Sequence, residues 1–396
     1  MVIETTVQTL LTYLGRVAPA CSQNPKANED DLTTGILMYV EGNKVHLKGF
    51  DNYTQITSSF EIPGENCTAG DKGVVVPPAF LTQLLRALPA ADTVRLTYDG
   101  DTMLHVDLGA SRFSARVRGV AVEQYPGFEQ SDEASMLFTL PGKDLKAMMG
   151  SSIFCASKDN FRDYLKTVRF KAHDNELSVT ALDGHRIARA MITPAELVET
   201  EGGNGFFLIS IKAATILYRM LPDSQDLITV RQTGDYMVAE LGSTTITIGL
   251  MKCKYPNVDG VFQRLENATC RYQINRKELL ANIKSAALFS NKRFNHLNLL
   301  FNGEDSSVHL RARQSEVGEA NAGMSMEPQC YNATEVEYDL NADYFFEVVS
   351  AIDTDSILLY SFQGDKPATT NIQIEPIHLG KEPAFTQKYA ISLVIV

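Results

Sequence analysis

The chain repeats one pattern three times along its 396 residues. Leu84–Pro89, with the sequence LLRALP, returns as Leu217–Pro222, with LYRMLP, and Val348–Asp353 is a weaker third copy. Tyr125-Pro126-Gly127 likewise returns as Tyr255-Pro256-Asn257. The repeat is longer than the roughly 20–50 residues of a solenoid unit and has the size of a small domain. We therefore predict three copies of one domain, and a tandem array of this kind suggests a curved or ring-shaped scaffold.

The expected domains are residues 1–130, 131–264 and 265–396, each long enough to bury its own core. Gly127–Ser135 and Asn257–Thr269 are the expected linkers, because they are polar and rich in turn-forming residues. A hydrophobic content of 44% with 21% charged residues is ordinary for a globular protein.

Three features of the composition bear on location and on cofactors. No apolar run approaches the ~20 residues that span a membrane, and Met1–Glu4 does not begin a signal peptide. The six cysteines are scattered without a C-x-x-C pair, which argues against a zinc site or a disulfide framework. We therefore expect a cytoplasmic protein without a metal or other cofactor.

Each repeat predicts a helix, a group of strands, a second helix and further strands. The clearest expected hairpins join Ile36–Val40 to Val45–Gly49, Val168–Ala172 to Leu177–Ala181, and Leu297–Phe301 to Val308–Ala312. In repeat one, the second helix should carry one apolar face made of Phe80, Leu81, Leu84, Leu85 and Leu88. The predicted fold class is α+β, with the helices on one face of antiparallel sheets.

Signals for catalysis are weak, since the chain has no P-loop, dinucleotide fingerprint, zinc-protease motif or nucleophile elbow. Asp183-Gly184-His185-Arg186 is the one dense polar cluster, and it could suggest a hydrolase using acid–base chemistry. The alternative is a turn at a strand end, with Gly184 supplying the bend and Arg186 pointing to solvent. Repeat one has Asp51 at the matching place but no histidine, so a binding site is the preferred interpretation.

Basic residues recur on the polar faces of the predicted helices: Arg16, Arg86, Lys146, Lys212, Arg219 and Lys284. If the repeats close into an arc with the helices inside, these charges would share a concave wall that attracts phosphates irrespective of sequence. The alternative is that these are simple solvated helix faces, in which case the protein would be an α+β adaptor that never touches DNA. The net charge of −12 argues against bulk coating of nucleic acid, but an acidic outside can accompany a basic inner face.

A charge asymmetry bears on assembly. A late strand of repeat one carries Arg112, Arg116 and Arg118 at alternating positions, whereas the corresponding outer region of repeat three carries Glu316 and Glu319. Alternating like charges protect a sheet edge and can also select an edge of opposite charge. Two chains could then pair head to tail and close a ring.

Taken together, the segments FTLP (138–141), FRDYL (161–165), ALDGHRIA (181–188), KYP (254–256) and ALFSNKRF (287–294) resemble those of the bacterial DNA polymerase III beta subunits, the sliding clamps. The resemblance runs through all three repeats. It implies a head-to-tail homodimer whose helices line a central hole and whose sheets form the outside. Such a ring encircles duplex DNA, slides, does no chemistry and tethers a polymerase.

The resemblance also implies a cleft for short extended peptides of the replicative polymerase, the clamp loader and other partners. By position the cleft would comprise Leu165, Leu182, Gly184, His185, Arg186, Ile187, Pro256, Val261, Tyr344, Ser392, Leu393 and Val394. Arg162 and Tyr164 would approach DNA with the basic helix residues. The dimer interface would use Arg112, Phe113, Arg116, Leu288, Phe289, Glu316 and Glu319. Two departures from the family, Gly260 in place of a frequent arginine and the tail Ser392–Val396, concern the peptide preference.

Overall fold

The structure is a computed structural model. It describes residues 1–22, 32–70, 73–90, 92–100, 102–108, 113–128, 135–199, 205–263, 268, 270–291, 293, 295–314, 316–330, 335–361, 371–380 and 382–394. The chain forms two compact units. Unit 1 comprises Met1–Lys143, Ala195–Asn204 and Thr215–Leu250, and unit 2 comprises Asp144–Pro194, Gly205–Ala214 and Met251–Val396.

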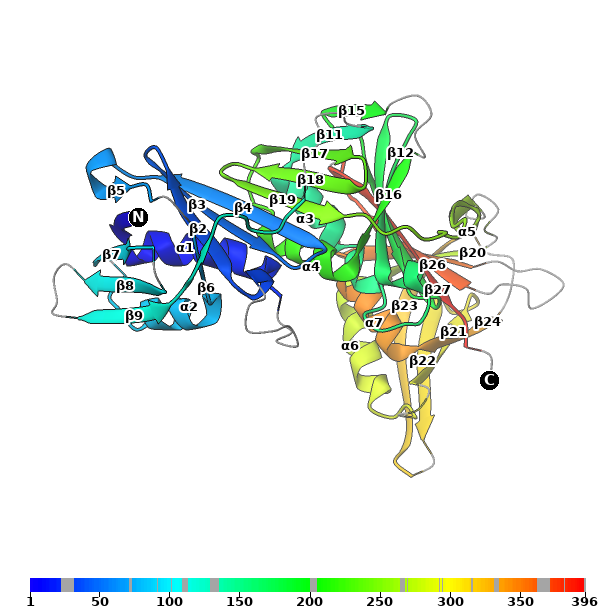
Figure 1. Ribbon diagram of the computed structural model, residues 1–396. Coiled ribbons are helices and arrows are strands. Elements are labelled where there is room, and N and C mark those ends of the chain that lie inside the picture. Colours follow the sequence, from blue (N-terminus) through cyan, green and yellow to red (C-terminus); the bar gives the residue numbers. More distant parts are fainter. Residues whose placement is uncertain are drawn as a thin grey trace. The chain divides into compact units, whose positions relative to one another are not determined.

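Unit 1 contains two antiparallel sheets (Figure 1). The five-stranded sheet has the order β5 (Cys67–Thr68), β1 (Val2–Thr6), β7 (Thr93–Tyr98), β8 (Met103–Leu108) and β9 (Ser114–Arg118). The ten-stranded sheet has the order β10 (Val120–Val122), β6 (Gly73–Val76), β2 (Ile36–Glu41), β3 (Lys44–Phe50), β4 (Thr54–Glu61), β19 (Thr244–Gly249), β18 (Tyr236–Leu241), β17 (Leu227–Thr233), β11 (Met136–Pro141) and β15 (Glu196–Glu199).

Two helices of repeat one pack side by side in unit 1, α1 (Val7–Val17) and α2 (Pro78–Arg86). The hydroxyl of Thr6 caps α1 by accepting from the backbone N–H of Thr9 at 3.1 Å. In α2 the buried stripe is Leu81 and Leu85, four residues apart. The prediction for Phe80 was wrong: its side chain is 56% exposed, because it lies about 100° around the helix from Leu81.

Unit 2 contains one twelve-stranded antiparallel sheet. Its order is β16 (Phe206–Ser210), β12 (Thr167–His173), β13 (Glu176–Leu182), β14 (Arg186–Ile192), β27 (Thr386–Ser392), β26 (Asn371–Ile377), β25 (Ser356–Ser361), β20 (Cys270–Asn275), β23 (Gly318–Cys330), β22 (Ser307–Gln314), β21 (His296–Asn302) and β24 (Glu335–Asn341). The helices that lie wholly within unit 2 are α5 (Asp259–Gln263), α6 (Arg276–Ala287) and α7 (Ala342–Ser350). Helix α6 packs against α7. Helices α3 (Gly142–Gly150) and α4 (Ile211–Met220) contribute residues to both units.

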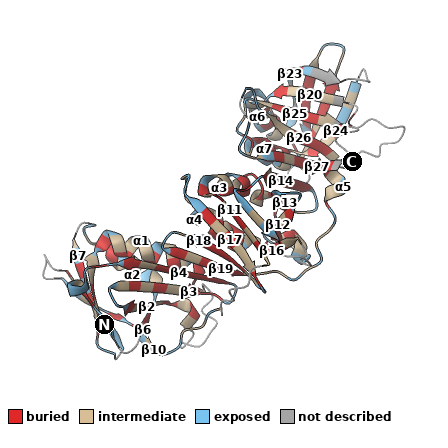
Figure 2. Cartoon of the chain, turned by 90° about the horizontal axis from the view of Figure 1, so that it is seen from above, coloured by how far each residue is buried: buried red, intermediate tan, exposed pale blue. Residues whose placement is uncertain are grey.

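The expected hairpins are confirmed as β2–β3, β12–β13 and β21–β22. Buried residues alternate with less buried ones along these strands, as in β2 and β22. Figure 2 shows such bands of buried and intermediate residues in the region of β3. The expected linker Asn257–Thr269 contains α5, which the sequence analysis missed. None of the helices in the described parts of the chain is long and apolar enough to cross a membrane.

The repeats are joined through their sheets in the same way twice. The last strand of repeat two, β19, pairs with β4 of repeat one, and the last strand of repeat three, β27, pairs with β14 of repeat two. Gly249 N donates to Tyr53 O at 2.8 Å in the first junction, and Ser392 N donates to His185 O at 2.7 Å in the second. These matching bonds identify equivalent positions in successive repeats.

Candidate functional site

The polar segment after β13 is a tight turn built around Asp183. Its Oδ1 accepts from the backbone N–H groups of His185 at 2.9 Å and Arg186 at 3.0 Å. Gly184 adopts φ +95°, in the left-handed region that favours glycine. Repeat one builds the same turn on Asp51, with Asn52 at φ 71°. The turn is therefore a feature of the fold, and the Asp183 carboxylate is used to shape it.

Arg186 does not point to solvent, so that expectation was wrong. Its side chain is buried, and its Nε donates to Asp183 Oδ2 at 3.0 Å. Nη2 donates to the carbonyl oxygen of Phe154 at 3.1 Å, and Nη1 donates to the Glu347 carboxylate. The guanidinium also lies over the Tyr344 ring, 4.6 Å from its centroid. These acceptors satisfy the donors of the cation inside the protein.

The surroundings of the Arg186 guanidinium stabilise its positive charge. Burial by itself lowers the pKa of Arg186, but its contacts with Cys155, Glu347 and Asp183 outweigh burial and raise the pKa above its ordinary value. An Asp–Arg–Glu ion network of this kind leaves Asp183 without a free role as a base. The arrangement disfavours the hydrolase interpretation.

A hollow of about 220 Å³ lies beside this turn in unit 2. Its lining residues come from β13, β14, β26, β27, the turn and the segment of α5, and they are Leu182, Gly184, His185, Arg186, Ile187, Val258, Val261, Asn371, Ala390 and Ser392. Leu165 packs with Leu182 and Ile187 in the apolar cluster under it. Apolar walls with a few polar groups at one side are typical of a site for a small apolar side chain or peptide.

The structure brings together most of the residues predicted for the cleft. Seven of the predicted residues line the hollow: Leu182, Gly184, His185, Arg186, Ile187, Val261 and Ser392. Tyr344 stacks on His185, with ring centroids 5.7 Å apart. Three further predicted residues are half-buried and are not among the lining residues: Pro256, Leu393 and Val394. The backbone N–H of Val394 donates to the carbonyl oxygen of Asp339 at 2.8 Å, and this bond attaches the C-terminal segment to β24. Peptide binding there stays a prediction.

The sequence analysis missed Val258, Asn371 and Ala390 in the lining and Phe262 in the cluster beneath it. The pairing of Ile187 with Ala390 brings β27 to the hollow from more than 200 residues away in the chain. No local pattern signals such a contact. Val258 could have been found, because it directly follows the repeated Tyr-Pro segment.

Asp259 fixes α5 on the outer part of the site. Its carboxylate contacts Lys171 Nζ at 3.1 Å, Arg189 Nη2 at 2.5 Å and Arg169 Nη2 at 3.6 Å. The rings of Tyr255 and Phe262 lie under the guanidinium groups of Arg169 and Arg189. One acid therefore holds the short helix on β12 and β14 and positions the wall formed by Val258 and Val261.

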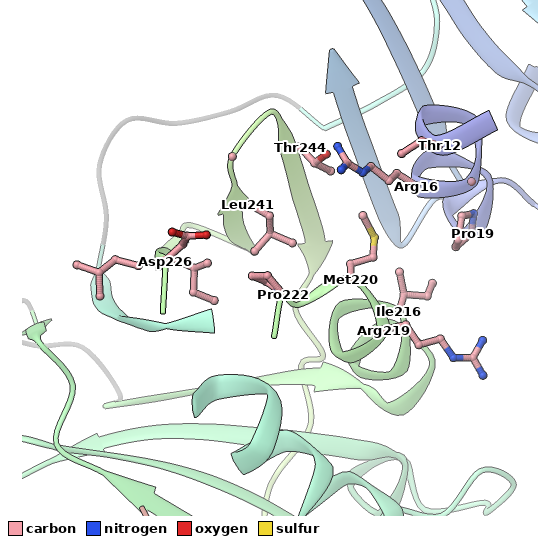
Figure 3. Close-up of a pocket in the computed structure, with 14 residues that line it drawn as sticks. Thr12, Arg16, Pro19, Ile216, Arg219, Met220, Pro222, Asp226, Leu241 and Thr244 are labelled. Carbon is pink, nitrogen blue, oxygen red and sulfur yellow. The ribbon is translucent and has the colours of Figure 1, made fainter. Parts of the chain in front are cut away.

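The predicted DNA-binding residues occupy both units. In unit 1, Arg86 and Arg219 are exposed and Arg16 is half-buried. Arg16 and Arg219 flank a groove of about 690 Å³ between α1 and α4, with Met220 and Leu241 among its apolar lining. Figure 3 shows Arg16 reaching from α1 toward Thr244, whereas Arg219 points away from the groove.

In unit 2, Lys212, Lys284 and Arg162 are exposed, and Lys146 and Tyr164 are half-buried. The guanidinium of Arg162 lies 5.1 Å from the centroid of the Phe161 ring, which is 86% exposed. That all these cations share one wall stays a prediction.

Most residues predicted for the dimer interface are accessible. Phe113, Arg116, Leu288, Glu316 and Glu319 are exposed, and Phe289 is half-buried. Arg112 lies outside the described residues. Arg116 lies on β9, the last strand of the five-stranded sheet, and Glu319 lies on β23.

Three α+β repeats joined edge to edge by antiparallel sheets, with basic helices and an apolar hollow, define the sliding-clamp class of fold. Models of the N-terminal, central and C-terminal domains of the DNA polymerase III beta subunit match residues 1–129, 139–257 and 266–375. The chain therefore belongs to the DNA polymerase III beta subunit family. The predicted fold class is confirmed, and so is the prediction of a non-catalytic subunit.

Similar proteins agree with this assignment. The beta sliding clamp of Staphylococcus epidermidis is 26% identical over 347 residues, covering 85% of this chain and 87% of that protein. The Staphylococcus aureus beta sliding clamp is 25% identical over 342 residues, with the same coverage. Among solved structures, the Pseudomonas aeruginosa DnaN sliding clamp bound to griselimycin has a TM-score of 0.86 at 18% identity and full coverage of both chains. The Thermotoga maritima beta subunit has a TM-score of 0.82 at 20% identity, covering 100% of this chain and 99% of that one.

Proposed function

We propose that two copies of this chain close a ring around duplex DNA and slide on it, holding a DNA polymerase and other partners at the hollow in repeat two. The basic helix residues, with Arg162 and Tyr164, would face the phosphates inside the ring. The partners would be the replicative polymerase, the clamp loader and other proteins with clamp-binding peptides, in the cytoplasm. Three domains with the boundaries 1–130, 131–264 and 265–396 would form each half of the ring.

The main support for a dimer is that the described part of the chain contains two strand junctions between repeats, while the strands equivalent to a third junction are left without each other as partners. The closing strands β19 and β27 each pair with a strand of the preceding repeat. The equivalent closing strand of repeat one is β9, and among the described strands it pairs only with β8. The equivalent acceptor in repeat three is the first half of β23, Gly318–Ser325, which among the described strands pairs only with β22. A second copy would satisfy both edges at once, head to tail.

The two existing junctions also predict the register of the third. Gln55 is opposite Thr247 and Ile187 is opposite Ala390. Glu319 takes the place of Gln55 and Ile187, because each pairs with the seventh residue of the strand before it, which is Phe50 in β3, Leu182 in β13 and Arg313 in β22. By the same argument, Arg116 takes the place of Thr247 and Ala390. Arg116 of one copy would therefore lie directly opposite Glu319 of the other, as a favourable cross-strand pair.

Charge reversal tests this assembly. Arg116→Glu should shift sedimentation from dimer toward monomer, and adding Glu319→Arg should restore much of the dimer. Glu337→Arg, which changes an exposed acid on β24, is the matched control and should leave the dimer unchanged. A dimer indifferent to Arg116→Glu would contradict the register.

The hollow would bind an extended peptide with apolar anchors, because its wall is apolar and includes Leu182, Ile187, Val261 and Ala390. The ring raises the effective concentration of a tethered polymerase near the primer end. Binding of a fluorescein-labelled synthetic peptide with Leu and Phe anchors, measured by anisotropy, tests this part. Griselimycin, present in the Pseudomonas aeruginosa structure, is a second probe that should compete with the peptide if it takes the same site.

A further inference from the structure

Repeat one contains a second copy of the framework that surrounds the hollow. The turn Asp51–Thr54 has the hydrogen bonds of Asp183–Arg186, and both are followed by the matching bonds from Gly249 and Ser392 described above. Tyr236 pairs with Gly249, and Asn371 pairs with Ser392. Phe50 of repeat one, with Tyr236 and Gly249 of the adjoining strands of repeat two, thus occupies the place of Leu182 with Asn371 and Ser392, which all line the hollow.

In repeat one an aromatic ring of the same chain occupies the corresponding space. The Phe128 ring is edge-on to Phe50, with centroids 5.0 Å apart, and 4.5 Å from the Tyr236 ring. Its tip approaches Gly249, where an added Cβ would lie 3.8 Å from Phe128 Cζ. The backbone N–H of Phe128 donates to Gln55 Oε1 at 2.9 Å. The hydrogen bond fixes the backbone of Phe128, and the contacts with Phe50, Tyr236 and Gly249 fix its ring.

Repeat two has a smaller residue at this place. Phe128 follows Tyr125-Pro126-Gly127, and Val258 follows Tyr255-Pro256-Asn257. Val258 is buried in the wall of the hollow, and the space that Phe128 fills in repeat one is there an open volume of about 220 Å³. Water takes about 30 Å³ per molecule in the liquid, so this volume is large enough for a side chain to displace several waters.

We infer that Phe128 is a built-in plug that closes the repeat-one copy of the hollow, and that Val258 keeps the repeat-two copy open. The inference rests on the proposed function in one respect, the use of the open hollow by partners. Of the two junctions among the described strands, the one in repeat two then offers such a hollow and the one in unit 1 does not, because position 128 is aromatic and position 258 is not. The two junctions also differ in polarity at matching positions, since unit 1 has the polar pair Gln55 and Thr247 where the hollow has the apolar pair Ile187 and Ala390.

The test exchanges the two residues in the full-length chain. Val258→Phe should place a ring in the hollow, so it should keep or raise the thermal unfolding temperature and weaken the labelled Leu/Phe peptide by about tenfold or more. Val258→Ala is the control, since it enlarges the hollow and should keep measurable binding. Phe128→Val, the mirror change, should lower the unfolding temperature by several degrees, because Phe50 and Tyr236 lose their packing partner, while peptide affinity stays unchanged.

Each outcome decides the inference. A Val258→Phe chain that binds the peptide like the wild type would overturn it, as would an unfolding temperature several degrees lower, since the ring would then not fit. If the wild-type chain itself binds no peptide, the proposed use of the hollow fails. The opposite effects of Val258→Phe and Phe128→Val on unfolding would still support the plug, and equal destabilisation by both would reject it.

Discussion

At the residue scale, Arg186 has the contacts of a structural cation rather than a surface charge. It connects the turn after β13 to α7 through Asp183 and Glu347, and it forms one side of the hollow. Its sequence context of Asp, Gly and His suggested either catalysis or an exposed turn. Local sequence could not distinguish these alternatives from burial, because the acceptors Phe154 and Glu347 come from distant parts of the chain.

Arg186→Leu should therefore destabilise the protein. Removing the cation leaves the half-buried Asp183 carboxylate without its charged partner, and the expected loss is about 3 kcal/mol in the free energy of unfolding. Urea unfolding would measure it. His185→Ala, which removes an exposed neighbour in the same turn together with its stacking on Tyr344, is the control and should change stability by no more than about 1 kcal/mol. Equal effects of the two substitutions would show that the ion network contributes little.

The apolar wall gives a second residue-scale prediction. Leu182→Asp or Ile187→Asp should abolish binding of the labelled peptide, because a carboxylate would face the apolar anchors in the hollow. Sedimentation should still show the dimer, since neither residue lies on β9 or β23. A dissociated dimer would count against the assignment of the cleft.

At the element scale, alternating buried and less buried residues made the hairpins predictable. Tyr39 and His46, for example, face each other across β2 and β3, while Met38 and Leu47 point inward. Helix α5 was not predictable in this way. Its five residues include Gly260, and so short a helix has little stability of its own. It forms where it does because Asp259 finds three cations on the sheet.

The charge of Asp259 makes this element sensitive to pH. Burial raises the pKa of the carboxyl, but the hydrogen bond from Lys171 and the charges of Arg189, Lys171 and Arg169 outweigh it and hold the pKa below its ordinary value. A carboxyl with a lowered folded-state pKa contributes stability above its ordinary pKa of about 3.9 and loses it as the pH falls through the folded-state value.

Unfolding of the wild type should therefore become easier as the pH falls below about 4, and Asp259→Asn should flatten part of this dependence. At pH 7 the same variant should loosen α5 and weaken the labelled peptide. Hydrogen exchange of the α5 amides at pH 7 would measure the loosening directly. Unchanged exchange in Asp259→Asn would mean that apolar contacts of Val258 and Phe262 alone hold the helix.

At the scale of the whole molecule, most of the architecture could be predicted from the three-fold repeat. Matching segments such as Leu84–Pro89 and Leu217–Pro222 indicated repeated domains, and the repeated junctions of β4 with β19 and β14 with β27 follow from them. Differences between the repeats were harder to predict, since Phe128 and Val258 acquire opposite roles only through residues that are far away in the chain. The hollow is one of these differences.

The basic helix residues give a prediction for the assembled ring. Reversing Arg86, Lys212 and Arg219 to Glu should shorten residence on DNA and reduce its dependence on salt, because fewer phosphate contacts release fewer counterions. Measuring residence on DNA at several salt concentrations checks this. Reversing Arg86 alone and reversing the exposed Arg95 of β7 alone give a matched pair with the same change in net charge. An equal effect of the two would mean that net charge, rather than the helix faces, governs retention.

The most direct test of the clamp is its retention on circular and on linear DNA, after loading by a compatible clamp loader. A closed ring that slides should stay on the circle and leave the linear molecule through its free ends. Cutting the circle after loading should release the protein. Equal retention on both forms would mean ordinary surface binding and would contradict a ring that encircles DNA.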